Sequence, residues 1–182
     1  GAQYFTVKAA SMAEQVERWL ACGVVAPWKG RLATLDAGPW TPTNSETTRY
    51  VGVPGMSAIA KHLAGDLDVV LQCRVTSVAP DGEGWQLMDE DGKALGKFDI
   101  LLLNAPAPQS VELVKEFPNF AGKIRTVETA PCWALMLAFE QRLDVLWDAA
   151  FVEDSPLSWI ARNSSKPGRP EMPDCWVLHA NP

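Results

Sequence analysis

Apolar residues recur along the chain at two spacings, one typical of helices and one typical of strands. Ser11-Met12-Ala13-Glu14 has the form of a capping box and precedes apolar residues spaced along one helical face, so we predict a helix from Ser11 to Gly23. A second helix is predicted over residues 54–65, from Pro54-Gly55 to a glycine at its C-cap. A third, short helix is predicted at residues 110–114.

Strands are predicted mainly in the second half of the chain. Asp81-Gly82 and Asp91-Gly92 are turn dipeptides on either side of Trp85-Gln86-Leu87-Met88, which indicates an antiparallel meander. The apolar run Phe98–Asn104 predicts a buried strand. Further strands are predicted at residues 69–71, 75–78, 129–139, 159–161 and 175–179. We therefore expect an α+β fold over residues 1–182 as a single region, with a mixed, largely antiparallel sheet and helices packed on it.

Composition and charge narrow the function classes. The 182 residues are 47% hydrophobic with 8 Trp, which is enough to build a globular core. No apolar run approaches the roughly 18 residues that a membrane span requires. The formal net charge of -6 opposes attraction to nucleic acid and to anionic membranes. We expect a partner that is a small molecule, and the oligomeric state stays open.

The cysteines and histidines indicate little classical site chemistry. The four cysteines are far apart and form no CxxC pair, so we interpret them as reduced core residues in a cytosolic protein. His62 and His179 are the only histidines, and the sequence has no HExxH, GxSxG or phosphate loop. We expect no metal site, and hydrolytic chemistry is disfavoured.

Three segments carry a family resemblance through their order and spacing. The first is Gly1-Ala2-Gln3-Tyr4-Phe5, and the second joins Tyr50–Ser57 to Gln72–Val78 through a helix. The third is the strand and turn Asp99–Pro108. Together these segments resemble the flavin-dependent amine oxidase superfamily and, within it, the bacterial renalase-like oxidoreductases. Taken alone, each segment has an ordinary alternative. The first is a strand start, the valine of the second is a core residue, and the third is a strand-ending turn.

The resemblance implies FAD as the cofactor and assigns residues to it. Gly1 would let the backbone approach the isoalloxazine ring, and Val75 would pair its backbone with the adenine. The cofactor-binding residues implied in this way are Gly1, Ala2, Gln3, Val75, Asn104, Ala105 and Pro106.

A second group of residues is expected around the substrate. Tyr4 and Phe5 are candidates for aromatic walls beside the flavin ring, with core packing as the equal alternative. Trp159, Arg162 and His179 lie on late strands that the resemblance places at the substrate cavity. Asn163, next to Arg162, is placed at the same cavity. Arg162 is a candidate for binding a substrate phosphate through its planar fork. The alternatives are a core Trp, a solvated Arg, a turn Asn and a hydrogen-bonded strand His.

The resemblance also implies that the chain is an internal part of a longer enzyme. FAD binding in the superfamily needs an amino-terminal GxGxxG turn, and no such motif occurs here. The Gly-Asp segment that completes the flavin site is missing as well. We expect a substrate domain with part of the FAD-contacting strands of a two-domain FAD oxidoreductase fold, and weak or absent FAD binding by this chain alone.

The implied activity is the oxidation of dihydro-NAD(P) isomers, with hydride transfer to flavin N5 and reoxidation by O2 that yields hydrogen peroxide. One alternative is an amine oxidase proper, but the strand Pro131–Phe139 has no lysine of the kind that many amine oxidases place there. Another is a binding module without catalysis, whose tryptophans would line a ligand or protein groove. The choice between NAD and NADP stays open.

Overall fold

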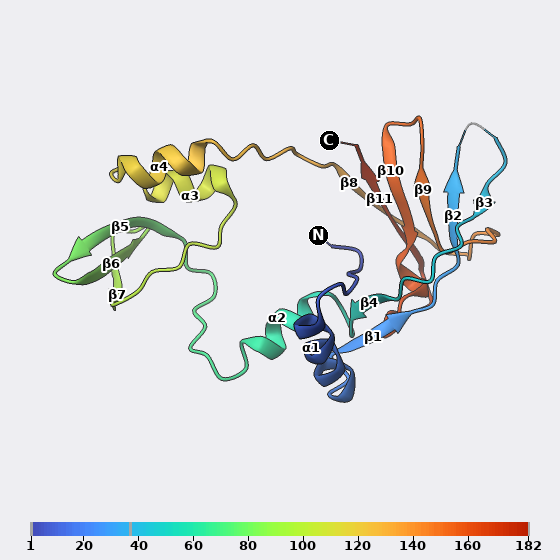
Figure 1. The fold of residues 1–182 in the computed structure, drawn as a ribbon, viewed down its shortest axis with the longest axis horizontal. Coiled ribbons are helices and arrows are strands. Elements are labelled where there is room, and N and C mark those ends of the chain that lie inside the picture. The colour runs from blue at the N-terminus through green and yellow to red at the C-terminus, as the bar shows by residue number, and fades with distance from the viewer. Residues whose placement is uncertain (1, 37, 182) are drawn as a thin grey trace. The chain divides into compact units, whose positions relative to one another are not determined.

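The computed structural model describes residues 2–36 and 38–181, and the chain forms two compact units rather than a single region (Figure 1). Residues 1–68 and 132–182 make the first unit, and residues 69–131 make the second. Both units combine strands with helices, so the predicted α+β class is confirmed. None of the described helices is long and apolar enough to cross a membrane.

A six-stranded sheet forms the centre of the first unit. Its order is β3-β2-β9-β10-β11-β8, and all neighbours are antiparallel except the parallel pair β2 and β9. The strands are β2 (Leu32–Leu35), β3 (Thr41–Pro42), β8 (Ala134–Phe139), β9 (Ala149–Val152), β10 (Leu157–Arg162) and β11 (Asp174–Ala180). The predicted strands at 159–161 and 175–179 are confirmed within β10 and β11. The strand predicted at 129–139 begins only at Ala134, and β9 was not predicted.

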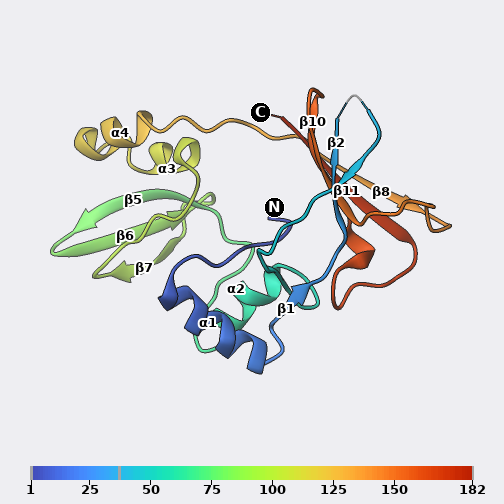
Figure 2. The ribbon, with the colours of Figure 1, turned by 45° about the vertical axis from the view of Figure 1, so that its right-hand side comes forward.

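Two helices and a strand pair complete the first unit. β1 (Val25–Trp28) pairs with β4 (Arg49–Gly52) in an antiparallel ladder. α1 (Ala10–Ala21) buries Val16 and Trp19 against Val25, and Ile59 of α2 (Ser57–Leu63) packs on the same cluster. In the ribbon, α1 and α2 lie next to each other beside β1 (Figure 2). The two helices therefore stand on one side of the β1–β4 pair.

The predicted boundaries of the two helices are partly right. Gly23 follows α1 with a φ of 70°, a left-handed conformation in which glycine has no Cβ to clash. The capping box is wrong, because α1 begins one residue earlier than Ser11 and its N-cap, Ala9, makes no side-chain cap bond. Similarly, α2 begins at Ser57, two residues after the predicted Pro54-Gly55 start.

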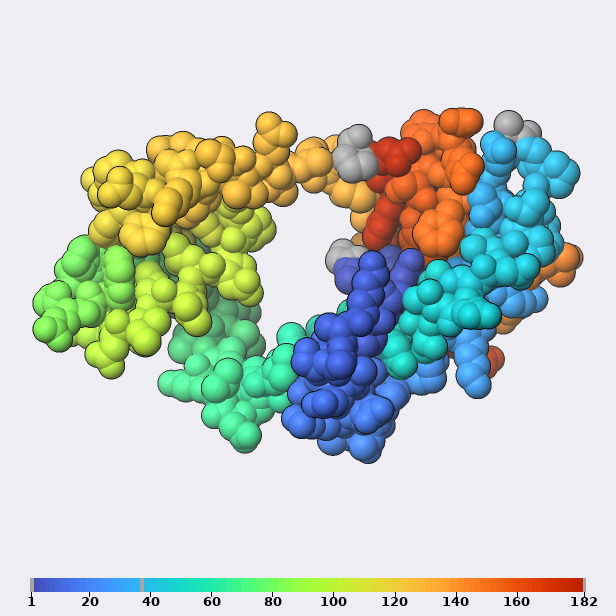
Figure 3. All heavy atoms as spheres, viewed as in Figure 1, coloured from blue at the N-terminus to red at the C-terminus, as the bar shows by residue number. Residues whose placement is uncertain are grey.

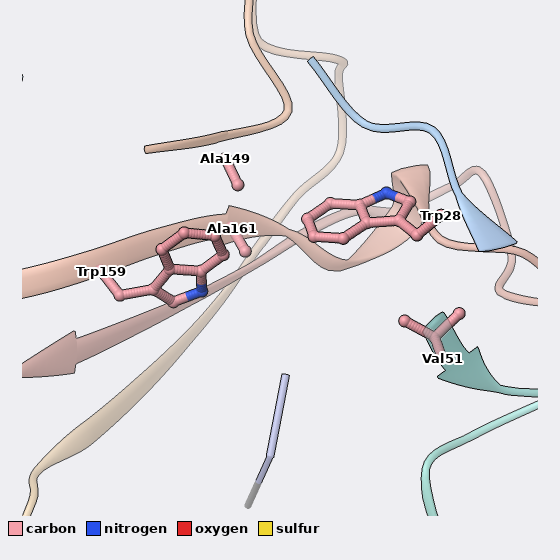
Figure 4. Packing of buried hydrophobic residues seen from close by; sticks show 5 residues of the cluster. All are labelled: Trp28, Val51, Ala149, Trp159 and Ala161. Carbon is pink, nitrogen blue, oxygen red and sulfur yellow. The ribbon is translucent and has the colours of Figure 1, made fainter. Parts of the chain in front are cut away.

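The apolar core of the first unit joins the sheet to the β1–β4 pair. Trp28 and Trp159 approach each other across Ala161 and Ala149, and Val51 of β4 lies beside Trp28 (Figure 4). Both alanines are fully buried, and their small side chains leave room for the two indoles.

A buried ion cluster lies at the end of β10. The Arg162 side chain is 1% exposed, its Nε lies 3.2 Å from Asp174 Oδ1, and its Nη1 lies 3.5 Å from Asp148 Oδ1. Its Nη2 donates a hydrogen bond to the carbonyl of Leu143 at 2.7 Å. Asp148 also accepts hydrogen bonds from the backbone and side chain of Arg31. Burial opposes the charge of Asp148, but Arg31 and Arg162 together lower its pKa.

The second unit consists of a small meander and two helices. The predicted antiparallel meander is confirmed by the strand order β5-β6-β7, with Gly82 and Gly92 both at positive φ in the turns. Its strands are β5 (Val75–Asp81), β6 (Gly84–Asp89) and β7 (Ala94–Phe98), and its helices are α3 (Ala107–Leu113) and α4 (Pro118–Arg125). The helices lie beside the strands within this unit (Figure 1). α4 was not predicted, and α3 contains most of the helix predicted at 110–114.

Two predicted strands are wrong. β7 ends at Phe98, and residues 99–104 form no strand, with Ile100 78% exposed and Leu102 86% exposed. Residues 69–71 likewise belong to no strand ladder, and their apolar side chains are exposed. In each case no neighbouring strand among the described residues pairs with the segment, and a lone strand leaves its backbone groups without partners.

The cysteine prediction is half right. All four cysteines are free, as predicted. They are not core residues, because Cys22 and Cys132 are exposed and Cys73 and Cys175 are half-buried.

We predict that the two arginines bound to Asp148 contribute very differently to stability. Arg162→Ala leaves Asp174 buried without its cation and is expected to lower the free energy of unfolding by about 3–5 kcal/mol. Arg31→Ala is the matched control, because the Arg31 side chain is 56% exposed and its ion pair contributes less than about 1 kcal/mol. Urea unfolding followed by tryptophan fluorescence measures both variants. Equal losses would contradict the assignment of Arg162 as the buried member.

Candidate functional site

The first unit has an aromatic pocket formed by the amino-terminal segment and the sheet. Its volume is about 350 Å³, within the range of sites that take a small ligand. It is lined by Ala2, Gln3, Tyr4, Phe151, Ser158, Trp159 and His179. The structure therefore brings together five of the residues that the sequence analysis assigned to cofactor or substrate, namely Ala2, Gln3, Tyr4, Trp159 and His179.

Strand register explains how these residues meet. Trp159 of β10 lies directly opposite Phe151 of β9 on one side and His179 of β11 on the other. Directly opposed residues project to the same face of a sheet, so these three side chains form one row. The Phe151 and Trp159 rings are 4.8 Å apart and edge-to-face. The row forms the sheet side of the pocket.

The amino-terminal segment supplies the opposite wall. Phe5 and Tyr50 exchange backbone hydrogen bonds of 3.0 and 2.9 Å, which fix the segment against β4. The Tyr4 ring lies 5.4 Å from the Trp159 ring and 6.3 Å from the Trp28 ring. In the space-filling view the blue amino-terminal residues lie beside the orange and red strands (Figure 3).

Phe5 and Arg162 are placed away from the aromatic pocket. The Phe5 ring stacks on Tyr50 at 5.7 Å and meets Trp19 edge-on, so it belongs to the core beneath α1. Arg162 is three residues after Trp159 on the same strand, and odd spacing turns its side chain to the other face of the sheet. Its guanidinium lies over Trp176 within the ion cluster, where no phosphate reaches it. Asn163 begins the short 3-10 helix η1 (Asn163–Ser165).

His179 contributes a neutral polar group to the aromatic pocket. Burial lowers its pKa from the ordinary value of 6.5, and the charge of Lys166 lowers it further. An uncharged imidazole donates one hydrogen bond and accepts another. His179 thus offers the pocket a hydrogen bond without a formal charge, whereas the Ser158 hydroxyl already donates to the backbone carbonyls of His179 and Ala180 at 3.3 Å.

Lys166 is a residue that the sequence analysis missed. It is 4% exposed, its Nζ donates a 2.6 Å hydrogen bond to Gln3 Oε1, and it lies 5.3 Å from the centre of the Trp28 ring. Burial, followed by the charge of Arg169, lowers its pKa to about 8. The only local signal is a run of turn-forming residues around it, which predicts a solvated loop. Its burial depends on Gln3, which is distant in sequence.

The second unit has a separate hollow of about 750 Å³, which we call the second-unit hollow. Its lining residues are Cys73, Arg74, Val75, Thr76, Ala105, Pro108, Gln109, Glu112 and Leu113. Val75 and Ala105, both assigned to FAD from the sequence, lie here. Asn104 and Pro106 flank Ala105 but do not line the hollow, and Gly1 lies outside the described residues.

Local hydrogen bonds set the shape of the second-unit hollow. Ser110 donates a 2.8 Å hydrogen bond to the carbonyl of Ala105, which holds the turn before α3. Val75 begins β5, and the ladder shifts register between Val75 and Ser77. β5 is also an edge strand of the meander, so one side of its backbone has no strand partner among the described residues. The backbone beside Val75 is therefore available to a ligand.

The comparisons with known proteins define the class of protein first. The family described as flavin containing amine oxidoreductase matches residues 16–181, and the chain belongs to this family. FAD is the cofactor to which that membership points. The sequence is 23% identical to mouse renalase over 187 residues, which cover 96% of this chain and 53% of renalase. The chain therefore spans about half the length of this curated relative.

A solved structure gives the corresponding result for the fold. The crystal structure of a putative protoporphyrinogen oxidase from Exiguobacterium sp. 255-15 matches with a TM-score of 0.53 and 17% identity. The match covers 75% of this chain and 31% of that chain. The predicted kinship with renalase-like members of the flavin amine oxidase superfamily is confirmed.

We predict that Lys166 makes stability depend on pH above neutrality. Because the folded state lowers its pKa to about 8 from 10.5, the unfolded chain binds more protons between those values. The free energy of unfolding therefore rises from pH 8 to 10.5 relative to Lys166→Met, by up to about 3 kcal/mol, and this difference is constant below pH 8.

Denaturant titrations at a series of pH values measure this difference. Lys166→Arg is the matched control, since a guanidinium stays charged through the whole range. A flat difference between wild type and Lys166→Met would contradict the lowered pKa.

Proposed function

We propose that this chain forms the substrate-binding part of an FAD-dependent oxidoreductase of the renalase type. The proposed substrates are dihydronicotinamide dinucleotide isomers, which leave as NAD(P)+. The observation that carries the proposal is the aromatic pocket of about 350 Å³, which Tyr4, Phe151 and Trp159 line. A planar, uncharged ring fits walls of this kind. The match to renalase over nearly the whole chain supports the same function.

The residues present fit chemistry in which the cofactor carries the reaction. When bound, FAD supplies the hydride acceptor, and O2 reoxidises it with formation of hydrogen peroxide. Tyr4 and Trp159 would orient the dihydronicotinamide ring, and the walls would exclude water from it. Formation of an aromatic pyridinium drives the reaction, so no residue has to remove a proton. The neutral His179 suits this requirement because it can hydrogen bond without acting as a strong base.

The second-unit hollow is the proposed place of the adenine. The free edge of β5 at Val75 offers backbone hydrogen bonds, and Arg74 beside it offers a positive charge. Ala105 would close the other side, held by Ser110. Asn104 and Pro106 adjoin this position.

We further propose that the remaining part of a longer enzyme covers the exposed apolar segments. Residues 69–71 and 99–103 expose large apolar side chains, such as Leu71 and Leu102, without a partner strand among the described residues. Such surface is typical of an interface. The sequence lacks GxGxxG, so the pyrophosphate-binding turn would come from the part that covers these segments. The proposed setting of the complete enzyme is the cytosol.

The second candidate is an amine oxidase, which the family description itself favours. β8 corresponds to the strand that carries a lysine in many amine oxidases, and its six residues include none. This departure favours the dihydronicotinamide substrate. A binding module without catalysis is the third candidate, and it predicts a complete protein that carries no flavin.

The deciding experiment is anaerobic reduction of the complete parent protein with FAD bound. Isomers of dihydro-NAD and dihydro-NADP are mixed with it in separate reactions, as are primary and secondary amines, and flavin absorbance is followed. Rapid bleaching by a dihydronicotinamide isomer alone is the expected result. Bleaching by an amine would instead support the amine oxidase. A parent protein that carries no flavin would support the binding module without catalysis.

We predict that Tyr4→Ala slows flavin reduction in the complete enzyme by more than tenfold, because the ring loses a wall that orients it. Phe5→Ala is the matched control, since Phe5 is also a half-buried aromatic but packs on Trp19 and Tyr50. Both variants lose stability, and only Tyr4→Ala is expected to lose the rate of reduction. Stopped-flow absorbance measures the rate, and equal rates in the two variants would remove Tyr4 from the site.

A further inference from the structure

The contact between Lys166 and Gln3 joins a buried cation to the wall of the aromatic pocket. Lys166 is buried next to Trp28, outside the pocket lining, and Gln3 belongs to that lining. The 2.6 Å hydrogen bond between Lys166 Nζ and Gln3 Oε1 is the link. Whatever fixes or releases this bond therefore changes the surface that the pocket presents.

The chemistry of an ammonium group fixes which way the amide turns. A lysine ammonium has three N–H donors and no acceptor, so the Gln3 atom that faces it has to be the amide oxygen. The amide NH2 group then points away from Lys166, and Nε2 makes no hydrogen bond among the described residues. Because Gln3 lines the pocket, an N–H donor at this position can donate a hydrogen bond to a ligand oxygen.

No carboxylate among the described residues neutralises Lys166. Lys166 also lines a different pocket of the first unit, and Asp148, Glu171, Lys29 and Arg169 are the other charged residues in the lining of that pocket. Asp148 is bound to Arg31 and Arg162, and no ion pair joins Lys166 to either acid. On the pocket side the titratable groups are Tyr4 and His179, and the pKa of His179 is lowered in part by the charge of Lys166. Gln3 is thus the principal polar partner of a buried cation.

We propose that Lys166 is a positioning residue that holds the Gln3 amide with its NH2 group toward the aromatic pocket, so that the pocket selects a ring bearing a carbonyl oxygen. The carboxamide of a nicotinamide ring and the ring carbonyls of a flavin share this chemistry. The identification with nicotinamide rests on the proposed function, whereas the orientation of Gln3 does not.

The proposal implies that the hydrogen-bond polarity of the Gln3 amide is fixed only while Lys166 is charged. A neutral lysine amine both donates and accepts hydrogen bonds, so the Gln3 amide is then free to turn over and present its oxygen to the pocket. Since the pKa of Lys166 is lowered to about 8, the donor is held toward the pocket at pH 7 and is no longer held there at pH 9. The pKa of His179 lies below 6.5, which separates its titration from this one.

The first test is NMR of the chain itself, without cofactor or turnover. We expect the Lys166 Nζ resonance and the Gln3 side-chain amide resonances to titrate with one common midpoint near 8. Lys166→Met removes the titration of the Gln3 amide. A Lys166 midpoint near 10.5, or Gln3 amide resonances that do not follow Lys166, would overturn the proposal.

The second test compares ligands with and without the acceptor. At pH 7 we expect nicotinamide to bind roughly tenfold more tightly than 3-methylpyridine, the value of about one hydrogen bond. That preference should fall at pH 9 and in Lys166→Met, where the amide is no longer held. It should disappear in Gln3→Glu, which keeps the contact with Lys166 but has no donor. Lys166→Arg should retain the preference at both pH values. Lumiflavin is the parallel probe for a flavin carbonyl.

The outcomes separate this proposal from the proposed function. A pH-dependent preference for nicotinamide or for lumiflavin supports the orientation of Gln3 and identifies which ring uses it. Equal binding of nicotinamide and 3-methylpyridine, with lumiflavin unaffected by pH, would overturn the selection even if dihydro-NAD bleaches the flavin. Conversely, if dihydro-NAD does not bleach the flavin, the proposed function fails, but a Gln3 amide that titrates with Lys166 still supports the orientation of Gln3.

Discussion

The buried guanidinium of Arg162 is the constraint on which the arrangement of the first unit depends. Through Asp174 and Asp148 it holds the start of β11 and the residue before β9 to the end of β10, and through Asp148 it reaches Arg31 before β2. The same strands carry Phe151, Trp159 and His179 on their opposite face. The ion cluster therefore fixes the register that places these three side chains in one row, although it takes no part in the pocket.

The aromatic pocket is uncharged at its surface but has cations behind its walls. Arg49 lies 5.2 Å from the centre of the Tyr4 ring, and Lys166 lies 5.3 Å from that of Trp28, which neighbours Tyr4. Such cation–π contacts stabilise the rings and give the wall a positive potential. The net charge of -6 for the whole chain gives no hint of this local field. An electron-rich ligand would be favoured here.

The turns of the meander were predicted from local chemistry, whereas the strand at residues 99–104 and the burial of Lys166 depend on distant partners. Gly82 and Gly92 set the turns of the meander by their own backbone conformation, so the sequence is sufficient there. The run at 99–104 is apolar enough for a strand, but a strand forms only when a neighbour pairs with it. Lys166 shows the same limit for the site, because the residues next to it predict a solvated loop and only Gln3 and Trp28 explain its burial.

Electrostatics also bear on the choice between the two candidate substrates. An amine is protonated in solution and would enter a pocket whose walls lie in front of Lys166 and Arg49. The charges of these two groups would oppose its ammonium group, and the described residues that line the pocket include no carboxylate to offset them. The proposed dihydronicotinamide ring would enter uncharged and would bring a carboxamide oxygen as an acceptor for the Gln3 NH2 group. The field that would weaken binding of an ammonium group thus favours a neutral ring with an acceptor.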